Sequence, residues 1–258
     1  MSRRQGWKVL QAGLMLLGFG LATFIWLTPV HLTAELAQEG MPAELQELVL
    51  GFRQVNTGEI SDAVDRVTGK RGFMSHEMRP LFPAKIVGPA VTVSARPSTK
   101  TVPPSHALEL IDTADPGSVL VIVMEGKDGK DITAMGGLMA TAASIRGLEG
   151  AVLDGAVRDT REIQEVRFPV FSRGITPSTS VGRYETVGKQ VPVVAGDVQV
   201  RPGDIIVGDV DGIVVVPLEH AAEVLKVAKQ LEEREKAMAR EIRRQRSILK
   251  ALEQIGRI

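Results

Sequence analysis

The sequence contains no cysteine among its 258 residues. This absence excludes disulfide bonds, cysteine nucleophiles and thiolate metal sites, and it is compatible with either side of a membrane. Charge of one sign does not predominate either, because 31 lysine and arginine residues balance 31 aspartate and glutamate residues. The balance gives no electrostatic case for nucleic acid as a partner. A chain of this length can bury one sizeable core, so a second independent domain is not required.

The first 34 residues differ from the rest in being apolar behind a basic start. Basic residues between Arg3 and Lys8 precede an apolar run from Val9 to Val30. A run of about 20 residues can span a bilayer as a helix, and the positive-inside rule would place the rest of the chain on the non-cytoplasmic side. We therefore expect a membrane anchor or an export signal over residues 1–34, followed by a linker over residues 35–44.

Helical and strand patterns alternate early in residues 45–217, and strands cluster late. This order predicts a layered α/β fold with more than one sheet. The expected helices cover Pro42–Phe52, Asn56–Val67, Pro103–Ala114 and Asp159–Val166, and the expected strands cover Lys85–Arg96, Ser118–Met124, Ala151–Leu153, Phe168–Ser172, Ile175–Val187, Val191–Val200, Asp204–Val207 and Gly212–Val216.

A single long helix is expected from Leu218 to Ile255, within a C-terminal extension over residues 218–258. Its apolar residues recur at a spacing of three and four, and at 1.5 Å per residue it would be about 57 Å long. Such a helix fits a coiled coil or a contact between subunits. Equally, its first half could dock on the domain while mixed charges form ion pairs along a solvated second half.

The stretch with most chemical content lies between Gly136 and Asp159. It reads as a glycine turn, a helix, a second glycine turn, a buried strand ended by Asp154, and a turn that opens another helix. The backbone amides of residues 136–139 would lie at a helix N-terminus, where free N–H groups and the helix dipole attract an anion such as a carboxylate. The alternative is a tight turn in which glycine supplies a positive φ.

Two charged residues follow the buried strand. Arg158 can form a bidentate pair with a carboxylate or an oxyanion; the alternative is a weak surface ion pair with Glu162. Asp159 is a hard oxygen ligand of the kind that holds Mg²⁺; the alternative is an ordinary aspartate at a helix start. Asp154 could orient the Arg158 loop or cap the turn.

These motifs, taken in order, resemble the RraA-like family, which includes the 4-hydroxy-4-methyl-2-oxoglutarate/4-carboxy-4-hydroxy-2-oxoadipate aldolases and the regulators of ribonuclease activity. The resemblance implies a swivelling β/β/α sandwich with a catalytic domain over residues 45–217. The residues that carry it are Ile60–Ala63, Ile86–Val93, Gly136–Ala142, Gly147–Asp159, Phe168–Gly174 and Pro202–Asp209.

By this resemblance the reaction is cleavage of a 4-hydroxy-2-oxo acid to pyruvate, with oxaloacetate decarboxylation as a side activity. Arg158 would bind substrate together with the amides of Gly136, Gly137, Leu138 and Met139, and Asp159 would bind a divalent metal, Mg²⁺ or alternatively Mn²⁺. No histidine lies near the motif as a proton carrier, and no motif lysine suggests a Schiff base. The resemblance also implies a homotrimer or hexamer.

One departure from the family pattern concerns Gly137. Aldolase members often carry an acidic residue directly after the first glycine of this turn. Asp209 or Asp211 could supply a carboxylate instead, across a subunit interface. Two interpretations therefore stay open: a metal-dependent aldolase, favoured by Arg158 and Asp159, and a non-catalytic RraA-like binding or regulatory protein, favoured by Gly137 and the apolar N-terminus.

Overall fold

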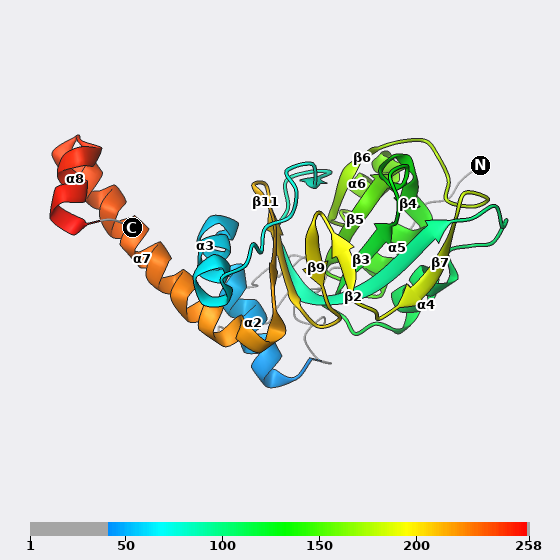
Figure 1. Cartoon of the computed structure of the whole chain (residues 1–258), viewed down its shortest axis with the longest axis horizontal. Coiled ribbons are helices and arrows are strands. Elements are labelled where there is room, and N and C mark those ends of the chain that lie inside the picture. Colours follow the sequence, from blue (N-terminus) through cyan, green and yellow to red (C-terminus); the bar gives the residue numbers. More distant parts are fainter. Residues whose placement is uncertain (1–40, 257–258) are drawn as a thin grey trace, which may run out of the picture.

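The computed structural model describes residues 41–256, which form a mixed α/β fold (Figure 1). Seven strands of its main sheet follow the order β1-β6-β5-β3-β2-β10-β11, while β4 pairs with β5 and β7 pairs with β2. A separate hairpin is made of β8 and β9. The strands are β1 (Arg79–Pro80), β2 (Ile86–Pro97), β3 (Val119–Met124), β4 (Thr133–Met135), β5 (Gly150–Val157), β6 (Val170–Ile175), β7 (Tyr184–Lys189), β8 (Val193–Ala195), β9 (Val198–Val200), β10 (Ile205–Asp209) and β11 (Gly212–Val216).

One half of the sheet is parallel and is covered on both faces. Strands β2, β3, β5 and β6 run parallel, and the connections between them carry helices α4 (Ser105–Thr113), α5 (Gly137–Ile145) and α6 (Thr160–Glu165). Side chains alternate along β3: Leu120 and Ile122 join the core beneath these helices, whereas Val119 and Val121 join the core beneath the β8–β9 hairpin. This double coverage explains why the strand is apolar throughout.

The other half is antiparallel. Strand β10 pairs antiparallel with both β2 and β11. Helices α2 (Ala43–Arg53), α3 (Thr57–Thr68) and α7 (Ala221–Gln245) pack against it. Their shared core includes Phe52, Ile60, Val207 and Val224, all buried. The predicted layered α/β fold is thus confirmed in its coarse form, and the swivelling type stays a prediction, as do the domain boundaries.

Three strand predictions were wrong in extent. The single strand expected over Val191–Val200 is instead the β8–β9 hairpin, which turns at residues 196–197. Strand β5 does not end at Leu153 but continues through Asp154 and Gly155 to Val157. Glycine suits position 155 because a Cβ there would lie 2.7 Å from Cγ of Met124. The strand expected over Ile175–Val187 is instead the end of β6, a connection over residues 176–183, and the start of β7. These connecting residues place their backbone and hydroxyl groups beside the end of β5.

The predicted C-terminal helix is present but broken. A short 3-10 turn, η2 (Leu218–His220), leads into α7, and Arg246 adopts a left-handed conformation with φ 51°. A second helix, α8 (Ile248–Ile255), then folds back on the end of α7, where Arg244 Nη2 donates to Gln254 Oε1 at 3.0 Å (Figure 1). The first half of α7 is docked and the far end projects from the body, as the second alternative predicted. A role between subunits stays a prediction.

The expected membrane placement needs correction. Within residues 41–256, no helix is both long and apolar enough to cross a membrane. The apolar run on which the expectation depended lies in residues 1–34, outside the described residues. The expected membrane anchor and non-cytoplasmic location therefore find no support in the described residues.

Candidate active site

Two parallel strands bring the predicted site residues together. Strand β4 pairs with the end of β5, with Met135 opposite Val157. Because both strands end at the same edge of the sheet, the chain leaves β4 into Gly136 beside the point where it leaves β5 into Arg158. The backbone N–H of Arg158 donates to the carbonyl oxygen of Met135 at 3.2 Å, which fixes the two turns side by side. Residues more than twenty positions apart therefore form one site.

Asp159 and Arg158 meet at the start of helix α5. Oδ2 of Asp159 accepts a hydrogen bond from the backbone N–H of Gly137 at 3.1 Å and lies 3.4 Å from Nε of Arg158. The Arg158–Asp159 contact is an ion pair without hydrogen-bond geometry, since Nε has no hydrogen-bond partner. Nη1 of Arg158 donates to the carbonyl oxygen of Ser178 at 3.2 Å. Both side chains stay partly open to solvent, at 40% and 44%.

Glycine at positions 136 and 137 is explained by close approach and not by a positive φ. Gly136 has φ −123° and ψ −177°, an extended backbone that any residue adopts. A Cβ at Gly136 would lie 2.7 Å from Oδ2 of Asp159 and 3.2 Å from Nε of Arg158. A Cβ at Gly137 would lie 3.0 Å from Cβ of Glu162. The alternative that these glycines serve a tight positive-φ turn is therefore wrong, and both are tied to the site.

Strain appears at Asp159 instead. This residue has φ 55° and ψ 41°, the left-handed region that non-glycine residues seldom adopt. It precedes helix α6 and turns its carboxylate back toward α5. An unfavourable backbone conformation at a residue with a partly free charged group is typical of functional sites.

The two residues after Gly137 contribute backbone and not side chains. The side chain of Leu138 is 89% exposed, and that of Met139 packs at the edge of the helix-side core. Their backbone N–H groups lie in the first turn of α5, where no residue of the described chain accepts a hydrogen bond from them. Such unsatisfied donors at a helix N-terminus are what an anionic ligand uses.

The weak ion pair considered for Arg158 is absent from the described structure. Arg161 pairs with Glu165 on α6 at 3.0 Å, and Arg158 makes no contact of this kind with Glu162. Glu162 lies instead against Gly137, where its Cγ would be 3.5 Å from an added Cβ. Sequence reasoning missed Glu162 as a neighbour of the turn. Its position in the first turn of α6, three residues after Asp159, was the available signal.

Two of the other three acidic candidates, Asp154 and Asp209, hold elements of the fold together. Asp154 neither orients the Arg158 loop nor caps a turn: it pairs with Arg173 and accepts the N–H of Gly196 at 2.8 Å, which joins β5, β6 and the hairpin. Asp209 caps helix α3, and strands β3 and β2 separate its strand from β5. Asp211 lies in the turn between β10 and β11. Neither Asp209 nor Asp211 completes the Arg158–Asp159 site within one chain.

A divalent cation would find one carboxylate ligand here. No group of three or more histidine, cysteine, aspartate or glutamate residues suited to a metal occurs within residues 41–256. Oδ1 of Asp159 forms no hydrogen bond or ion pair with a described residue, and the side chain is 44% exposed. One exposed carboxylate fits Mg²⁺, which keeps several waters and takes one or two carboxylates together with substrate oxygens. It does not fit a closed structural metal site.

Comparisons with known proteins agree with this fold and identify the family. A family description, "RraA-like: Aldolase/RraA", matches residues 57–215. A protein of Halalkalibacterium halodurans, provisionally named 4-hydroxy-4-methyl-2-oxoglutarate aldolase, is 34% identical over 198 residues, which cover 76% of this chain and 89% of that protein. The 4-hydroxy-4-methyl-2-oxoglutarate aldolase of Thermus thermophilus is 30% identical over 135 residues, covering 52% of this chain and 80% of that enzyme.

Similarity to solved structures also indicates the RraA-like fold. The crystal structure of Streptomyces coelicolor RraAS2, described as an unusual member of the RNase ES inhibitor RraA protein family, superposes with a TM-score of 0.65 at 30% identity. The match covers 74% of this chain and 94% of that one. The fold and site define a mixed α/β protein with a charged pair at the carboxyl edge of its parallel strands. The chain belongs to the RraA-like family, as its motif order predicted.

Proposed function

We propose that this protein is a divalent-metal-dependent lyase that cleaves a 4-hydroxy-2-oxo acid of the 4-hydroxy-4-methyl-2-oxoglutarate type. The observation that carries the proposal is the meeting of Arg158 and Asp159 with the free amides of helix α5. The names of relatives at 30% and 34% identity support the substrate class. Decarboxylation of oxaloacetate, which develops negative charge at the same position, is proposed as a side activity.

Each residue of the site has a separate proposed role in binding or catalysis. The N–H groups of Leu138 and Met139 bind the carboxylate beside the 2-oxo group, at the positive end of the α5 dipole. Arg158 stabilises negative charge that develops on the 2-oxo oxygen as the bond between C3 and C4 breaks. Asp159 would hold the divalent cation through its carboxylate, whose Oδ2 also accepts the N–H of Gly137. When bound, the cation supplies Lewis-acid polarisation of the 2-oxo group.

The balance of the reaction defines its products. The C4 hydroxyl loses its proton and becomes a carbonyl, the electrons of the C3–C4 bond move onto C3, and C3 gains a proton. From 4-hydroxy-4-methyl-2-oxoglutarate both fragments are pyruvate. No histidine within residues 41–256 forms a hydrogen bond or ion pair with Arg158 or Asp159, and water is the proposed proton carrier.

The test is pyruvate release by the full chain from 4-hydroxy-4-methyl-2-oxoglutarate and from oxaloacetate, with Mg²⁺ and with EDTA. The expected result is release that requires the cation, is abolished in Asp159→Asn, and is unchanged in Glu165→Gln, a matched exposed carboxylate on α6. Absence of cation-dependent release by the folded protein from either acid would reject the lyase. The regulatory alternative within the family would then be the better account.

Assembly is also part of the proposal. The family resemblance implies a trimer or a hexamer, and two apolar side chains on α5, Leu138 and Ile145, are 89% and 80% exposed. Large apolar side chains gathered on an exposed helix are common where a second protein surface covers them. Light scattering of the purified chain measures the assembly directly.

A further inference from the structure

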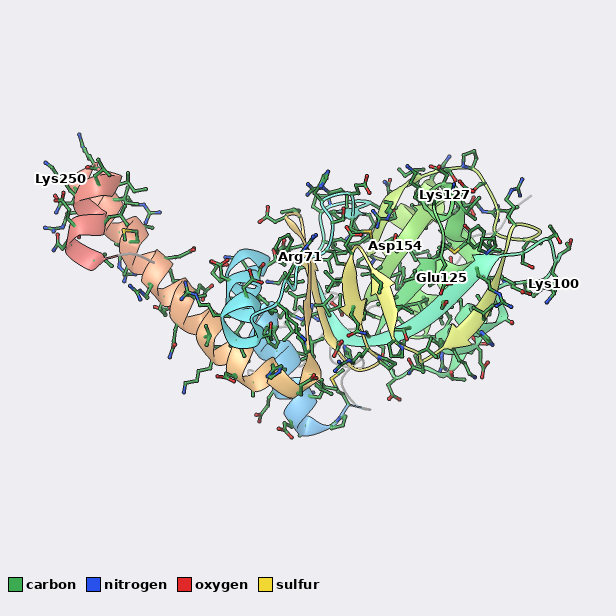
Figure 2. All side chains as sticks on the ribbon, viewed as in Figure 1. Arg71, Lys100, Glu125, Lys127, Asp154 and Lys250 are labelled. Atoms are coloured by element: carbon green, nitrogen blue, oxygen red, sulfur yellow. The ribbon has the colours of Figure 1, made fainter. Side chains whose placement is uncertain are left out.

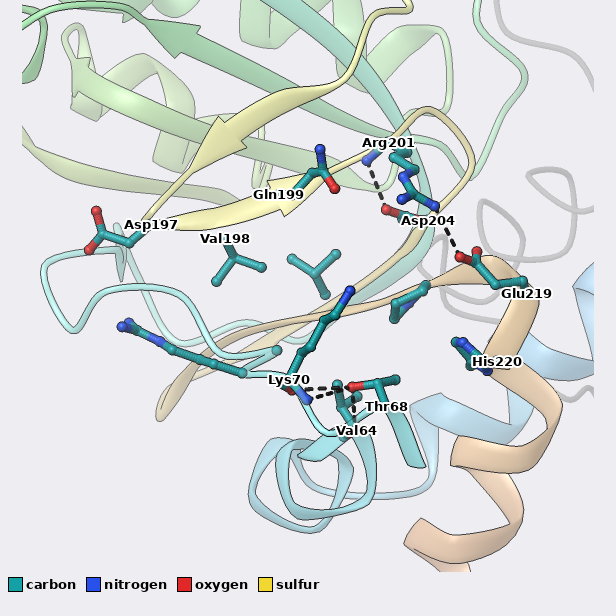
Figure 3. Close-up of a pocket in the computed structure, with 14 residues that line it drawn as sticks. Val64, Thr68, Lys70, Asp197, Val198, Gln199, Arg201, Asp204, Glu219 and His220 are labelled. Atoms are coloured by element: carbon teal, nitrogen blue, oxygen red, sulfur yellow. Dashed lines mark hydrogen bonds and ion pairs between the residues drawn. The ribbon is translucent and has the colours of Figure 1, made fainter. Parts of the chain in front are cut away.

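A cavity lies in the antiparallel half of the molecule. It has a volume of about 250 Å³ and opens between the end of α3, the β8–β9 hairpin, the end of β11 and η2 (Figure 3). In the sheet, strands β10, β2 and β3 separate β11 from β5. The cavity is therefore distinct from the Arg158–Asp159 site.

The floor of this cavity is apolar and its rim is charged. Val64, Val198 and Val215 are buried side chains that line it. The lining also includes Lys70 and Arg201. Figure 3 shows the Lys70 side chain rising from the turn after α3 toward Gln199 and Arg201 on the opposite wall.

Lys70 is held in place by its backbone while its ammonium group is unpaired. The backbone N–H of Lys70 donates to Oγ1 of Thr68 at 3.1 Å, and Oγ1 donates in turn to the carbonyl oxygen of Val64 at 2.8 Å. Gly69, with φ 67°, ends the helix immediately before it. Within the described chain, Nζ of Lys70 has neither a hydrogen bond nor an ion pair. Lys70 is an exposed residue of the cavity lining, so its unpaired ammonium group is open to an anionic ligand that enters over the apolar floor.

The acidic residues around the cavity are already engaged or distant. Asp204 is 4% exposed, and its two oxygens accept the backbone N–H groups of Arg201 at 2.8 Å and Leu218 at 3.2 Å. Glu219 pairs with Nη1 of Arg201 at 3.0 Å. Asp197 lies at the far end of the cavity from Arg201 (Figure 3). None of these carboxylates neutralises Lys70.

We propose that this cavity binds a small organic anion, a carboxylate or phosphate oxyanion on a short apolar body, through the ammonium group of Lys70. Gln199 and the guanidinium of Arg201 provide further donors on the opposite wall, and the three valines contact the apolar body. A charged hydrogen bond supplies the orientation and the apolar floor supplies size selection. The site does not depend on the proposed lyase activity.

The test is isothermal titration of the full chain at constant ionic strength with two probes, inorganic phosphate and isovalerate. Saturable binding of phosphate assigns a phosphate ligand, and saturable binding of isovalerate assigns a carboxylate with a branched apolar body. For the probe that binds, Lys70→Gln is expected to weaken affinity by about ten-fold or more, the loss of one charge-assisted hydrogen bond, and Lys70→Arg to restore most of it.

Two controls make the result specific. Lys250→Gln removes another lysine, on α8 at the far end of the projecting helices (Figure 2), and should leave the affinity unchanged. Asp159→Asn should also leave it unchanged, because that residue belongs to the other site. The proposal is overturned if neither probe binds saturably, or if folded Lys70→Gln binds as tightly as the unaltered chain.

Discussion

Two aspartates each bind the N-terminus of a different helix, and they differ in how many of their carboxylate oxygens accept hydrogen bonds. Asp209 serves α3 with both oxygens: Oδ1 accepts the hydroxyl of Thr57 at 2.8 Å and the N–H of Asp211 at 2.9 Å, and Oδ2 accepts the N–H of Thr57 at 3.3 Å. Asp159 serves α5 with Oδ2 alone, through Gly137 at 3.1 Å. The same local role thus engages both oxygens of Asp209 in hydrogen bonds, whereas Oδ1 of Asp159 accepts none.

The difference separates a carboxylate engaged by the fold from the one proposed to bind a ligand. Asp209 joins the antiparallel half of the sheet to α3, and both of its oxygens accept hydrogen bonds from the fold. Asp159 keeps a free oxygen, stands beside an arginine and faces unpaired amides, so a cation and an anionic substrate could both bind there. Helix capping alone therefore does not identify a site, because the contacts that remain unfilled decide it.

Among substitutions at the glycine turn, Gly136→Ala should have the largest effect on activity. The added Cβ would lie 2.7 Å from Oδ2 of Asp159 and must displace the carboxylate or the turn. Because a misplacement of about 1 Å can cost about 100-fold in rate, pyruvate release should fall by about that factor. Steady-state kinetics measures it.

The matched control is Gly174→Ala, where an added Cβ meets no atom within 4 Å. It should keep its activity. Equal activity in Gly136→Ala and the unaltered chain would show that close approach at this turn does not set the position of Asp159.

The paired substitutions Asp209→Asn and Asp159→Asn should separate stability from activity. At position 209 the amide group would face an N–H or hydroxyl donor, so the free energy of unfolding should fall by about 1–3 kcal/mol. At position 159 the amide can turn outward and asparagine tolerates the left-handed backbone, so the loss should be about 0.5 kcal/mol or less. Urea denaturation of both variants measures this. Similar losses at the two positions would contradict the distinction.

The smallest expected effect is a pH dependence from Glu149, which accepts Nη2 of Arg53 at 2.9 Å and the N–H of Val87 at 3.2 Å. Burial raises the pKa of Glu149 above its ordinary 4.5, and Arg53 opposes this rise only in part. The folded state then binds the proton more tightly than the unfolded chain. The free energy of unfolding should therefore decline as pH rises from 4.5 through the folded pKa.

Glu149→Gln should remove that decline, whereas Glu165→Gln, an exposed carboxylate on α6, should keep it. Urea denaturation at several pH values between 4.5 and 7 provides the measurement. An unchanged slope in Glu149→Gln would show that burial does not govern this carboxyl group.

Much of the fold could be predicted because local pattern and tertiary role agree. The continuous apolar run of β3 is buried on both faces, and the helix expected over Asn56–Val67 is present as α3 (Thr57–Thr68). Motif order was enough to identify the family. Arg158 and Asp159 were brought together with Gly136 and Gly137 as expected, although their roles in binding stay predictions.

What the sequence could not provide depends on contacts between distant residues. Asp154 and Gly155 look like a turn, but pairing with Arg173 and close packing on Met124 keep them in β5. Two glycines suggest a turn with positive φ, whereas here they make room for Asp159. The break at Arg246 depends on α8 packing back on α7, which a regular apolar spacing does not reveal.

The most direct test of the proposed metal site is to measure Mn²⁺ binding through the loss of the free-ion electron paramagnetic resonance signal. The measurement compares the unaltered chain with Asp159→Asn and Asp209→Asn. The account predicts that Asp159→Asn weakens binding by about ten-fold or more, while folded Asp209→Asn binds as the unaltered chain does. Unweakened binding in Asp159→Asn, or loss of binding in Asp209→Asn alone, would contradict the assignment of Asp159 as the metal ligand.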